Sequence, residues 1–268
     1  MPPMSIFSMM ASSLREAFAL GAVDYITKPF HVAELEARVK THLEIGRLRG
    51  KLEVQVAKRT AELVETLEKL ERSNREILNR LGLASEYRDN ETANHLKRMS
   101  RYSVAIGRAA GLSEIMLNNL GQASMMHDVG KIGIPDNILR KPSRLDPAEF
   151  DVMKTHPVKG REIIDSVLED FGLGAFGHTN ILRNIAEFHH EAVDGSGYPN
   201  GLKGEEIPIE ARISAVADVF DALTSRRSYK APWSNEQAFA MLRQMSNSKL
   251  DRDCVEALIN NGDKVLEI

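Results

Sequence analysis

Apolar residues recur every seven positions along segment 44–83, and charged residues fill the positions between them. This stripe consists of Val56, Leu63, Leu67, Leu70, Ile77 and Leu81. Heptad spacing of this kind is typical of a coiled coil, and Thr60 and Asn74 interrupt it. We expect a linker helix that pairs two chains in a parallel dimer, with Asn74 as one polar layer. The alternative is a single amphipathic helix that lies on its own protein.

Segment 84–268 has the three- and four-residue apolar spacing of helices. One such run is Ile209, Ile213, Val216, Phe220 and Leu223, directly after Pro208. Helix starts are marked by Ser113, by Asp146-Pro147 with Glu149, and by Ser234 with Gln237. The helix that starts at Ser113 is expected to reach about Val129. Because no comparable alternating pattern occurs, we expect a mainly α protein in which 84–268 is an all-helical domain.

The first 43 residues have a different pattern. A helical stretch at 13–19 leads through Gly21 to the strand-like Val23-Asp24-Tyr25-Ile26, and Lys28-Pro29-Phe30 precedes a second helical stretch. This alternation indicates part of an α/β unit. One or two strands cannot bury both faces of a parallel sheet, so we expect this part to be poorly supported on its own.

Composition narrows the possible functions. The 268 residues carry a formal net charge of −3, so no global basic field attracts a nucleic acid polymer. The sequence lacks a run of about 18 uncharged apolar residues, which argues against a membrane span, and its N-terminus lacks the basic segment, apolar core and cleavage site of a secretory signal. A single cysteine, Cys254, fits a reducing compartment, and the expected location is the cytoplasm.

Histidines and carboxylates gather at helix ends and on apolar helix faces of the 84–268 domain. Glu91 and His95 stand four apart, and an apolar run leads to His127-Asp128. The others are His156, His189, His190 and Asp218. Each pattern alone also fits a solvated pair or a capped carboxylate. Together they favour two or three divalent ions such as Fe or Mn, held by imidazoles and shared carboxylates, which is a centre suited to phosphoryl transfer.

These residues lie in longer motifs. The run His127-Asp128-Val129-Gly130-Lys131 is followed by His156, by His189-His190-Glu191 with Gly195 and Gly197-Tyr198-Pro199, and by the segment from Asp218 to Lys230. Over about 84–258 this order resembles the HD-GYP family, phosphodiesterases of the HD superfamily that linearise the bacterial second messenger cyclic di-GMP. The resemblance implies an all-helical domain with a metal-dependent hydrolytic site.

The resemblance also assigns roles. It implies a metal-ligand set of Glu91, His95, His127, Asp128, His156, His189, His190 and Asp218. Asp128 would bridge two ions, and Glu91 is associated with a third. Lys131 is placed at the scissile phosphate, while Tyr198, Arg227 and Lys230 would contact the substrate. The Gly197-Tyr198-Pro199 loop is either a lip of the active site and a surface for diguanylate cyclases, or only a surface turn.

The segment from Ala17 to Phe30 resembles the closing third of a response-regulator receiver domain, with Lys28 at the position that contacts the phosphoryl group. The acceptor aspartate of that family would lie upstream of Met1. The chain would then be a truncated relative of a two-component regulator, or its true start would lie further upstream. The expected organisation is therefore a receiver fragment over 1–43, a coiled-coil helix over 44–83 and the hydrolase domain over 84–268.

The function expected from these features is hydrolysis of cyclic di-GMP to linear pGpG by attack of a metal-bridging hydroxide, with further cleavage to GMP left open. Asp128 and Lys131 are the expected catalytic residues. Two alternatives stay open. The motifs contain nothing that reads the base, so another cyclic dinucleotide is compatible with them. A catalytically weak sensor that binds the dinucleotide and signals through protein partners is compatible as well.

Overall fold

The structure is a computed structural model that describes residues 18–19, 21–26, 28–89, 93–170, 179–225, 232–246 and 248–262. The chain divides into two compact units, Met1–Leu70 and Glu71–Ile268. Among the described helices, none combines the length and apolar character needed to cross a membrane.

Helix α2 runs without interruption from Val32 to Asp89. The predicted boundaries at 43/44 and 83/84 both fall inside it. Ion pairs one turn apart, such as Glu65 with Lys69 at 2.6 Å, follow its polar face. The predicted apolar stripe is solvent-exposed in the single chain: Leu63 is 59% exposed and Leu67 is 49% exposed.

Residues 22–26 form no strand, which corrects the strand predicted over 23–26. A strand needs a neighbour for its backbone donors and acceptors, and the described residues of this unit supply none. Asp24 instead contacts α2, where Arg38 Nη1 donates to its carboxylate at 2.9 Å and His42 Nε2 lies 3.1 Å away.

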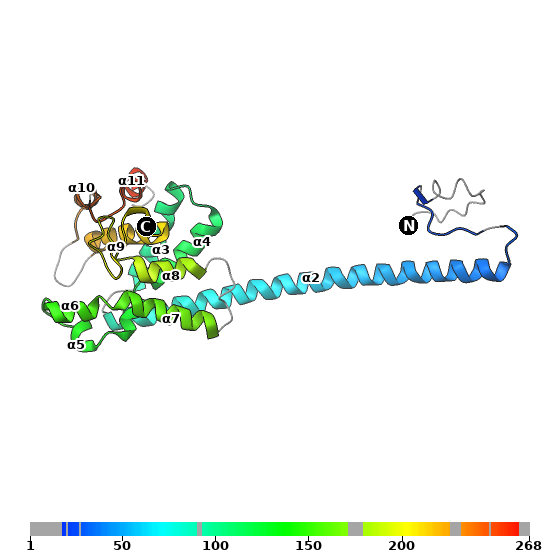
Figure 1. The fold of residues 1–268 in the computed structure, drawn as a ribbon, viewed down its shortest axis with the longest axis horizontal. Coiled ribbons are helices and arrows are strands. Elements are labelled where there is room, and N and C mark those ends of the chain that lie inside the picture. The colour runs from blue at the N-terminus through cyan, green and yellow to red at the C-terminus, as the bar shows by residue number, and fades with distance from the viewer. Residues whose placement is uncertain are drawn as a thin grey trace. The chain divides into compact units, whose positions relative to one another are not determined.

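The described residues of Glu71–Ile268 are mainly helical, as predicted, and the helices are labelled in Figure 1. Its described elements are α3 (Ala93–Ala109), α4 (Glu114–Ala123), η1 (Ser124–Met126), η2 (Val129–Gly133), α5 (Asp136–Leu139), α6 (Pro147–Met153), α7 (His156–Asp170), α8 (Thr179–Phe188), η4 (Gly204–Glu206), α9 (Ile209–Thr224), α10 (Asn235–Met245) and α11 (Arg252–Asn260). In the part of the chain that is described, β pairing is limited to one isolated bridge, between Asp194 and Lys203.

The predicted helix starts are confirmed. Ser113 accepts a hydrogen bond from the N–H of Met116 at the start of α4. Reciprocal capping boxes begin α6 at Asp146, with Pro147 in its first turn, and α10 at Ser234. These starts were predictable because each cap depends only on residues within one turn of it.

The helix expected to run from Ser113 to about Val129 is shorter than predicted. It ends at Ala123, tightens into the 3₁₀ turn η1 and leaves His127-Asp128 in a turn before η2. The ring of His127 explains part of the change, because its Nδ1 lies 2.8 Å from the backbone oxygen of Ser124, three residues earlier. The break turns His127-Asp128 into the interior.

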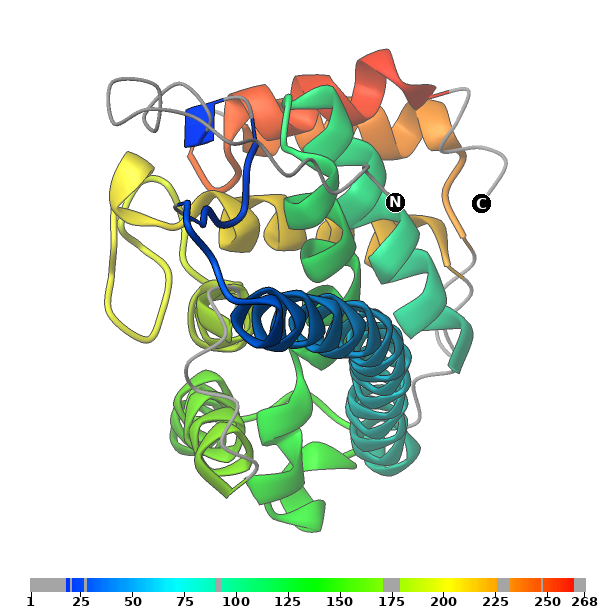
Figure 2. The same ribbon diagram turned by 90° about the vertical axis from the view of Figure 1, so that its right-hand side faces the viewer.

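Helix α9 runs through the main core. Its Phe220 meets Tyr102 of α3 edge to face, with ring centroids 5.1 Å apart, and stacks on Phe239 of α10. Figures 1 and 2 both show α10 and α11 at one end of this unit and α5 to α7 at the other, with α8 and α9 between. A second cluster of apolar side chains, from η1, η2, α7 and α8, fills the other end.

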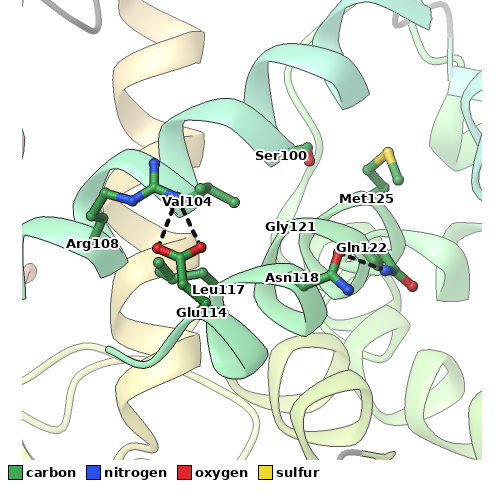
Figure 3. A pocket seen from close by; sticks show the side chains of 9 residues that line it. All are labelled: Ser100, Val104, Arg108, Glu114, Leu117, Asn118, Gly121, Gln122 and Met125. Atoms are coloured by element: carbon green, nitrogen blue, oxygen red, sulfur yellow. Dashed lines mark hydrogen bonds and ion pairs between the residues drawn. The ribbon is translucent and has the colours of Figure 1, made fainter. Parts of the chain in front are cut away.

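Helices α3 and α4 pack through small residues. A Cβ on Gly121 would lie 2.8 Å from Val104 and 3.1 Å from the hydroxyl of Ser100. Beside this contact is a hollow of about 510 Å³, which Arg108 and Glu114 border with an ion pair of 3.2 Å (Figure 3). None of the predicted site residues that the structure describes lines it.

Candidate metal centre

The candidate site is centred on the carboxylate of Asp128. Its Oδ1 lies 3.1 Å from Nε2 of His156 and 3.6 Å from Nε2 of His189. Its Oδ2 lies 3.1 Å from Nε2 of His127 and 2.8 Å from Nζ of Lys131. Residues separated by as many as 62 positions therefore meet at one carboxylate.

The close approach of η2 to α7 makes this meeting possible. A Cβ on Gly130 would lie 1.9 Å from the backbone oxygen of His156 and 2.4 Å from the nitrogen of Gly160. Only a glycine at position 130 allows the two backbones to come this close. Gly130 thus brings the turn that carries Asp128 against the first residues of α7.

Backbone carbonyls set the tautomers of three histidines. Nδ1 of His127 lies 2.8 Å from the oxygen of Ser124. Nδ1 of His156 lies 2.9 Å from the oxygen of Met153, and Nδ1 of His189 lies 2.9 Å from the oxygen of Ile185. A carbonyl oxygen can only accept, so each Nδ1 carries a proton, and in a neutral ring Nε2 then presents its lone pair toward Asp128.

In these tautomers no proton lies between the Nε2 atoms that face one another. Nε2 of His156 and Nε2 of His189 are 3.3 Å apart, and both are acceptors in these tautomers. Asp128 Oδ1 is buried and accepts no hydrogen bond from the described residues. Converging lone pairs in a buried site are costly unless a cation lies among them. The donor set therefore fits a metal ion, and imidazole with carboxylate suits first-row divalent ions.

The ligand atoms form two neighbouring groups. The first, the Asp128 group, contains Asp128, His156, His189 and His190, and the second, the Asp218 group, contains His95, His127 and Asp218. Within each group the ligand atoms lie within 4.8 Å of one another. The ring centroids of His127 and His189 are 5.3 Å apart, which links the two groups. Seven of the eight predicted ligands are thus brought together, and Glu91 lies outside the described residues.

Protonation states agree with ligand roles. Burial works to raise the pKa of Asp128, but the effects that lower it, of which the charge of Lys131 is the largest, hold that pKa well below its ordinary value. Burial lowers the pKa of His189. Burial and the neighbouring His189 hold the pKa of His190 well below its usual range. The carboxylate is therefore charged and both imidazoles are neutral, as metal ligation requires.

Asp221, which was absent from the sequence-based predictions, supports His95 from behind. Its buried carboxylate lies 2.8 Å from Nδ1 of His95 and accepts hydrogen bonds from Arg98 and Ser225. Burial works to raise the pKa of Asp221, but the hydrogen bonds from His95 and Arg98 lower it to about 2. Burial opposes protonation of His95, yet the bond to Asp221 raises its pKa. One signal was available: Asp221 lies one turn after Asp218 on the same helix.

Two of the predicted substrate contacts are described: Lys131, which lies beside Asp128, and Tyr198. Its ring centroid lies 4.8 Å from that of His190 and 6.4 Å from that of His156. Burial raises its pKa, so the phenol stays protonated and can donate a hydrogen bond. Arg227 and Lys230 lie outside the described residues.

Taken together, the fold and the site define a helical domain with a buried cluster of histidines and aspartates that suits divalent metal ions. The family model described as HD domain matches residues 55–254. The chain belongs to the HD domain family, and its His127-Asp128 and Gly197-Tyr198-Pro199 motifs belong to the HD-GYP branch.

Two curated relatives show the range of this similarity. The chain is 39% identical over 253 residues to the cyclic di-GMP phosphodiesterase response regulator RpfG of Xanthomonas campestris, covering 94% of this chain and 65% of RpfG. It is 38% identical to 3'3'-cGAMP-specific phosphodiesterase 2 of Vibrio cholerae, covering 78% of this chain and 39% of that protein. The chain thus spans less than two thirds of either relative.

A solved structure shares the fold. The crystal structure of a cyclic GMP-AMP specific phosphodiesterase from V. cholerae, V-cGAP3, superposes with a TM-score of 0.52 at 20% identity. The match covers 72% of this chain and 50% of that chain. At this identity the similarity concerns the fold alone.

Proposed function

We propose that the chain is a metal-dependent phosphodiesterase that hydrolyses cyclic di-GMP. The observation that supports this most is the convergence of the His156 and His189 imidazoles on the charged Asp128 carboxylate, with Lys131 beside it. The similarity between the chain and RpfG extends over 94% of the chain's length. In the reaction, water adds to one phosphorus of the ring, and the 3′ oxygen leaves with a proton. The product is linear pGpG, and a second cleavage would give GMP.

The residues proposed to hold the ions are the two groups described above, with Asp128 shared between them. Glu91 would add a ligand for a third ion, so two or three Fe or Mn ions are proposed. When bound, such ions make water nucleophilic near neutral pH and neutralise phosphate charge.

The chain's own residues orient and stabilise. Backbone carbonyls hold His127, His156 and His189 in one tautomer, so the site is preorganised before any ion or substrate binds. The ammonium of Lys131 lies at Asp128, where it would stabilise negative charge that develops on the phosphate. Tyr198 would contact the ligand beside His190, and Arg227 and Lys230 would hold its phosphates.

A second candidate substrate is 3'3'-cGAMP. The relative named as specific for that dinucleotide is 38% identical to this chain, close to the 39% of RpfG. The residues that converge at Asp128 act on the phosphodiester, which all cyclic dinucleotides share. Parallel assays with cyclic di-GMP and 3'3'-cGAMP decide between them, and a higher kcat/KM for cyclic di-GMP is expected.

The decisive experiment is turnover by protein prepared without oxygen and loaded with Fe(II) or Mn(II). We expect pGpG to appear, and we expect His127→Ala and Asp128→Ala to abolish its formation while circular dichroism stays helical. Unchanged turnover in these variants would reject the proposed site. Stoichiometric binding of cyclic di-GMP without product would instead identify a sensor that signals through protein partners.

We also propose that α2 pairs two chains in a parallel coiled coil. Its stripe of Leu63, Leu67 and Leu70 is exposed in the single chain, between charged positions. Burial of this stripe against a second copy would remove apolar surface from water. The side chain of Asn74, the expected polar layer, lies outside those described.

The remaining proposals concern input and partners. The similarity to a response regulator supports a receiver-derived segment over 1–43. The loop at Gly197-Tyr198-Pro199 is proposed as a surface for diguanylate cyclases, the enzymes that would supply the substrate. A cytoplasmic location is proposed with them, because the substrate is a bacterial second messenger.

A further inference from the structure

We propose that Glu191 is a positioning residue that fixes Tyr198 and Pro199 in the wall of the substrate site. This inference rests on the proposed function, since it concerns how the same site binds its dinucleotide. Glu191 directly follows the two histidines of the Asp128 group, yet its side chain turns away from them into the loop of residues 194–204.

The carboxylate of Glu191 binds three successive backbone amides. Oε1 accepts from the N–H of Asn200 at 2.7 Å and of Gly201 at 3.2 Å. Oε2 accepts from the N–H of Leu202 at 3.0 Å. Glu191 is only 5% exposed, and these three backbone amides are the donors that its carboxylate meets among the described residues. The three amides therefore supply its electrostatic partner, as in other backbone anion sites.

The loop of residues 194–204 packs against the backbone of residues 190–192, which includes a metal ligand of the Asp128 group. A Cβ on Gly197 would lie 2.2 Å from the nitrogen of Ala192 and 2.5 Å from Cα of Glu191, so only glycine fits there. The N–H of Tyr198 donates to the backbone oxygen of His190 at 3.2 Å. The backbone of His190 thus holds the loop at Tyr198, and the carboxylate of Glu191 holds it at residues 200–202.

Tyr198 contacts His190 and also lines a hollow. Its ring centroid lies 4.8 Å from that of His190. The hollow has a volume of about 490 Å³, and Pro199, Thr155 and Lys159 help to line it. A hollow of this size suits a nucleoside. A shift of Tyr198 would therefore disturb the half of a dinucleotide that extends beyond the reacting phosphate, while leaving every ligand of the metal groups in the chain.

The test compares Glu191→Gln with wild type on two substrates. Glutamine keeps the size but places an NH₂ group against backbone N–H donors. Cyclic di-GMP contains a second nucleotide, whereas bis(p-nitrophenyl) phosphate contains only a diester. We expect the kcat/KM of E191Q to fall about tenfold more on cyclic di-GMP than on the small diester, mainly through KM. Glu206→Gln is the matched control, because Glu206 accepts from the N–H of Lys203 in the same loop at 2.9 Å.

A double-mutant cycle and a binding measurement complete the test. If Glu191 acts through Tyr198, Tyr198→Ala should show the same substrate dependence, and the two effects should not add. Calorimetric titration of metal-loaded protein with cyclic di-GMP gives Kd without needing turnover, and E191Q should raise it about tenfold. Equal losses on both substrates, additive effects or an unchanged Kd would overturn the inference.

The outcomes also separate this inference from the proposed function. Wild type that hydrolyses cyclic di-GMP, with E191Q indistinguishable from it, leaves the phosphodiesterase and removes the positioning role. Wild type that binds without product, but loses affinity in E191Q, removes the phosphodiesterase and keeps the positioning role. Wild type that neither binds nor hydrolyses cyclic di-GMP overturns both.

Discussion

Nδ1 of His95 on α3 lies 2.8 Å from the carboxylate of Asp221 on α9, although the two residues are 126 positions apart. Because Asp221 is ionised, it accepts this hydrogen bond, and Nε2 of His95 is left to face His127 and Asp218. Carboxylates behind metal-binding imidazoles orient the ring and increase its basicity. The pair therefore connects the packing of α3 on α9 to the candidate centre.

Asp221→Asn should weaken metal binding without unfolding the protein. The amide cannot replace the charge behind His95 and Arg98, and losses of such partners cost about 10–100-fold in metal affinity. Metal titration with elemental analysis measures the effect. Asp165→Asn serves as control, because Asp165 also pairs with two arginines but lies on α7 away from the centre. Equal affinity in wild type and D221N would contradict the role of Asp221.

Acid should reveal the same residue in the metal-free protein. The pKa of Asp221 is lowered from 3.8 to about 2 on folding, so its charged form contributes stability at pH above about 4. That contribution, about 2 kcal/mol, is lost as pH falls through 2. Urea unfolding at a series of pH values should show wild type losing more stability than D221N over this range. Parallel curves would show that Asp221 has the same pKa in both states.

Lys131→Ala should lower kcat by about 10²–10³ with metal still bound, because it removes a cation placed where phosphate charge would develop. Steady-state assays with measured metal content test this, and Lys97→Ala, an exposed change on α3, controls for the loss of one surface charge. A fall in metal content that accounts for the whole loss would assign Lys131 to the support of Asp128 instead.

Gly130→Ala should destabilise the domain by about 3 kcal/mol or more, because its Cβ would overlap the backbone of His156 and Gly160. Thermal unfolding measures the loss. Gly50→Ala on α2 has nothing within 4 Å of its Cβ and should be neutral or slightly stabilising. An unchanged melting temperature in G130A would show that η2 and α7 can move apart.

Leu63→Asn combined with Leu67→Asn should convert a dimer into a monomer at micromolar concentration. These residues lie in the exposed stripe of α2, and polar side chains there remove the apolar seam. Light scattering reports the mass. Lys69→Ala, outside the stripe, should leave the dimer intact. A wild-type chain that is already monomeric would contradict the coiled coil.

Local sequence predicted where several helices begin, but it predicted no distance between side chains of different helices. The caps at Ser113, Asp146 and Ser234 were predictable because a cap involves residues three positions apart. Strand 23–26 was wrong, because pairing needs a partner that pattern alone does not supply. The helix predicted over 113–129 was too long, because its end also depends on contacts that the pattern does not contain. The burial of His127 and its bond to Ser124 favour a break that periodicity does not show.

By itself, the sequence determined which residue types were available to bind metal, their order, and the motifs that indicate a phosphodiester substrate. Tertiary structure decided which atoms meet: the tautomers aimed at Asp128, the carboxylate of Asp221 behind His95, and the amides around Glu191. The physical reason is range. Helix periodicity and capping act over a few residues, whereas a buried charge is satisfied by whatever partner packing brings to it.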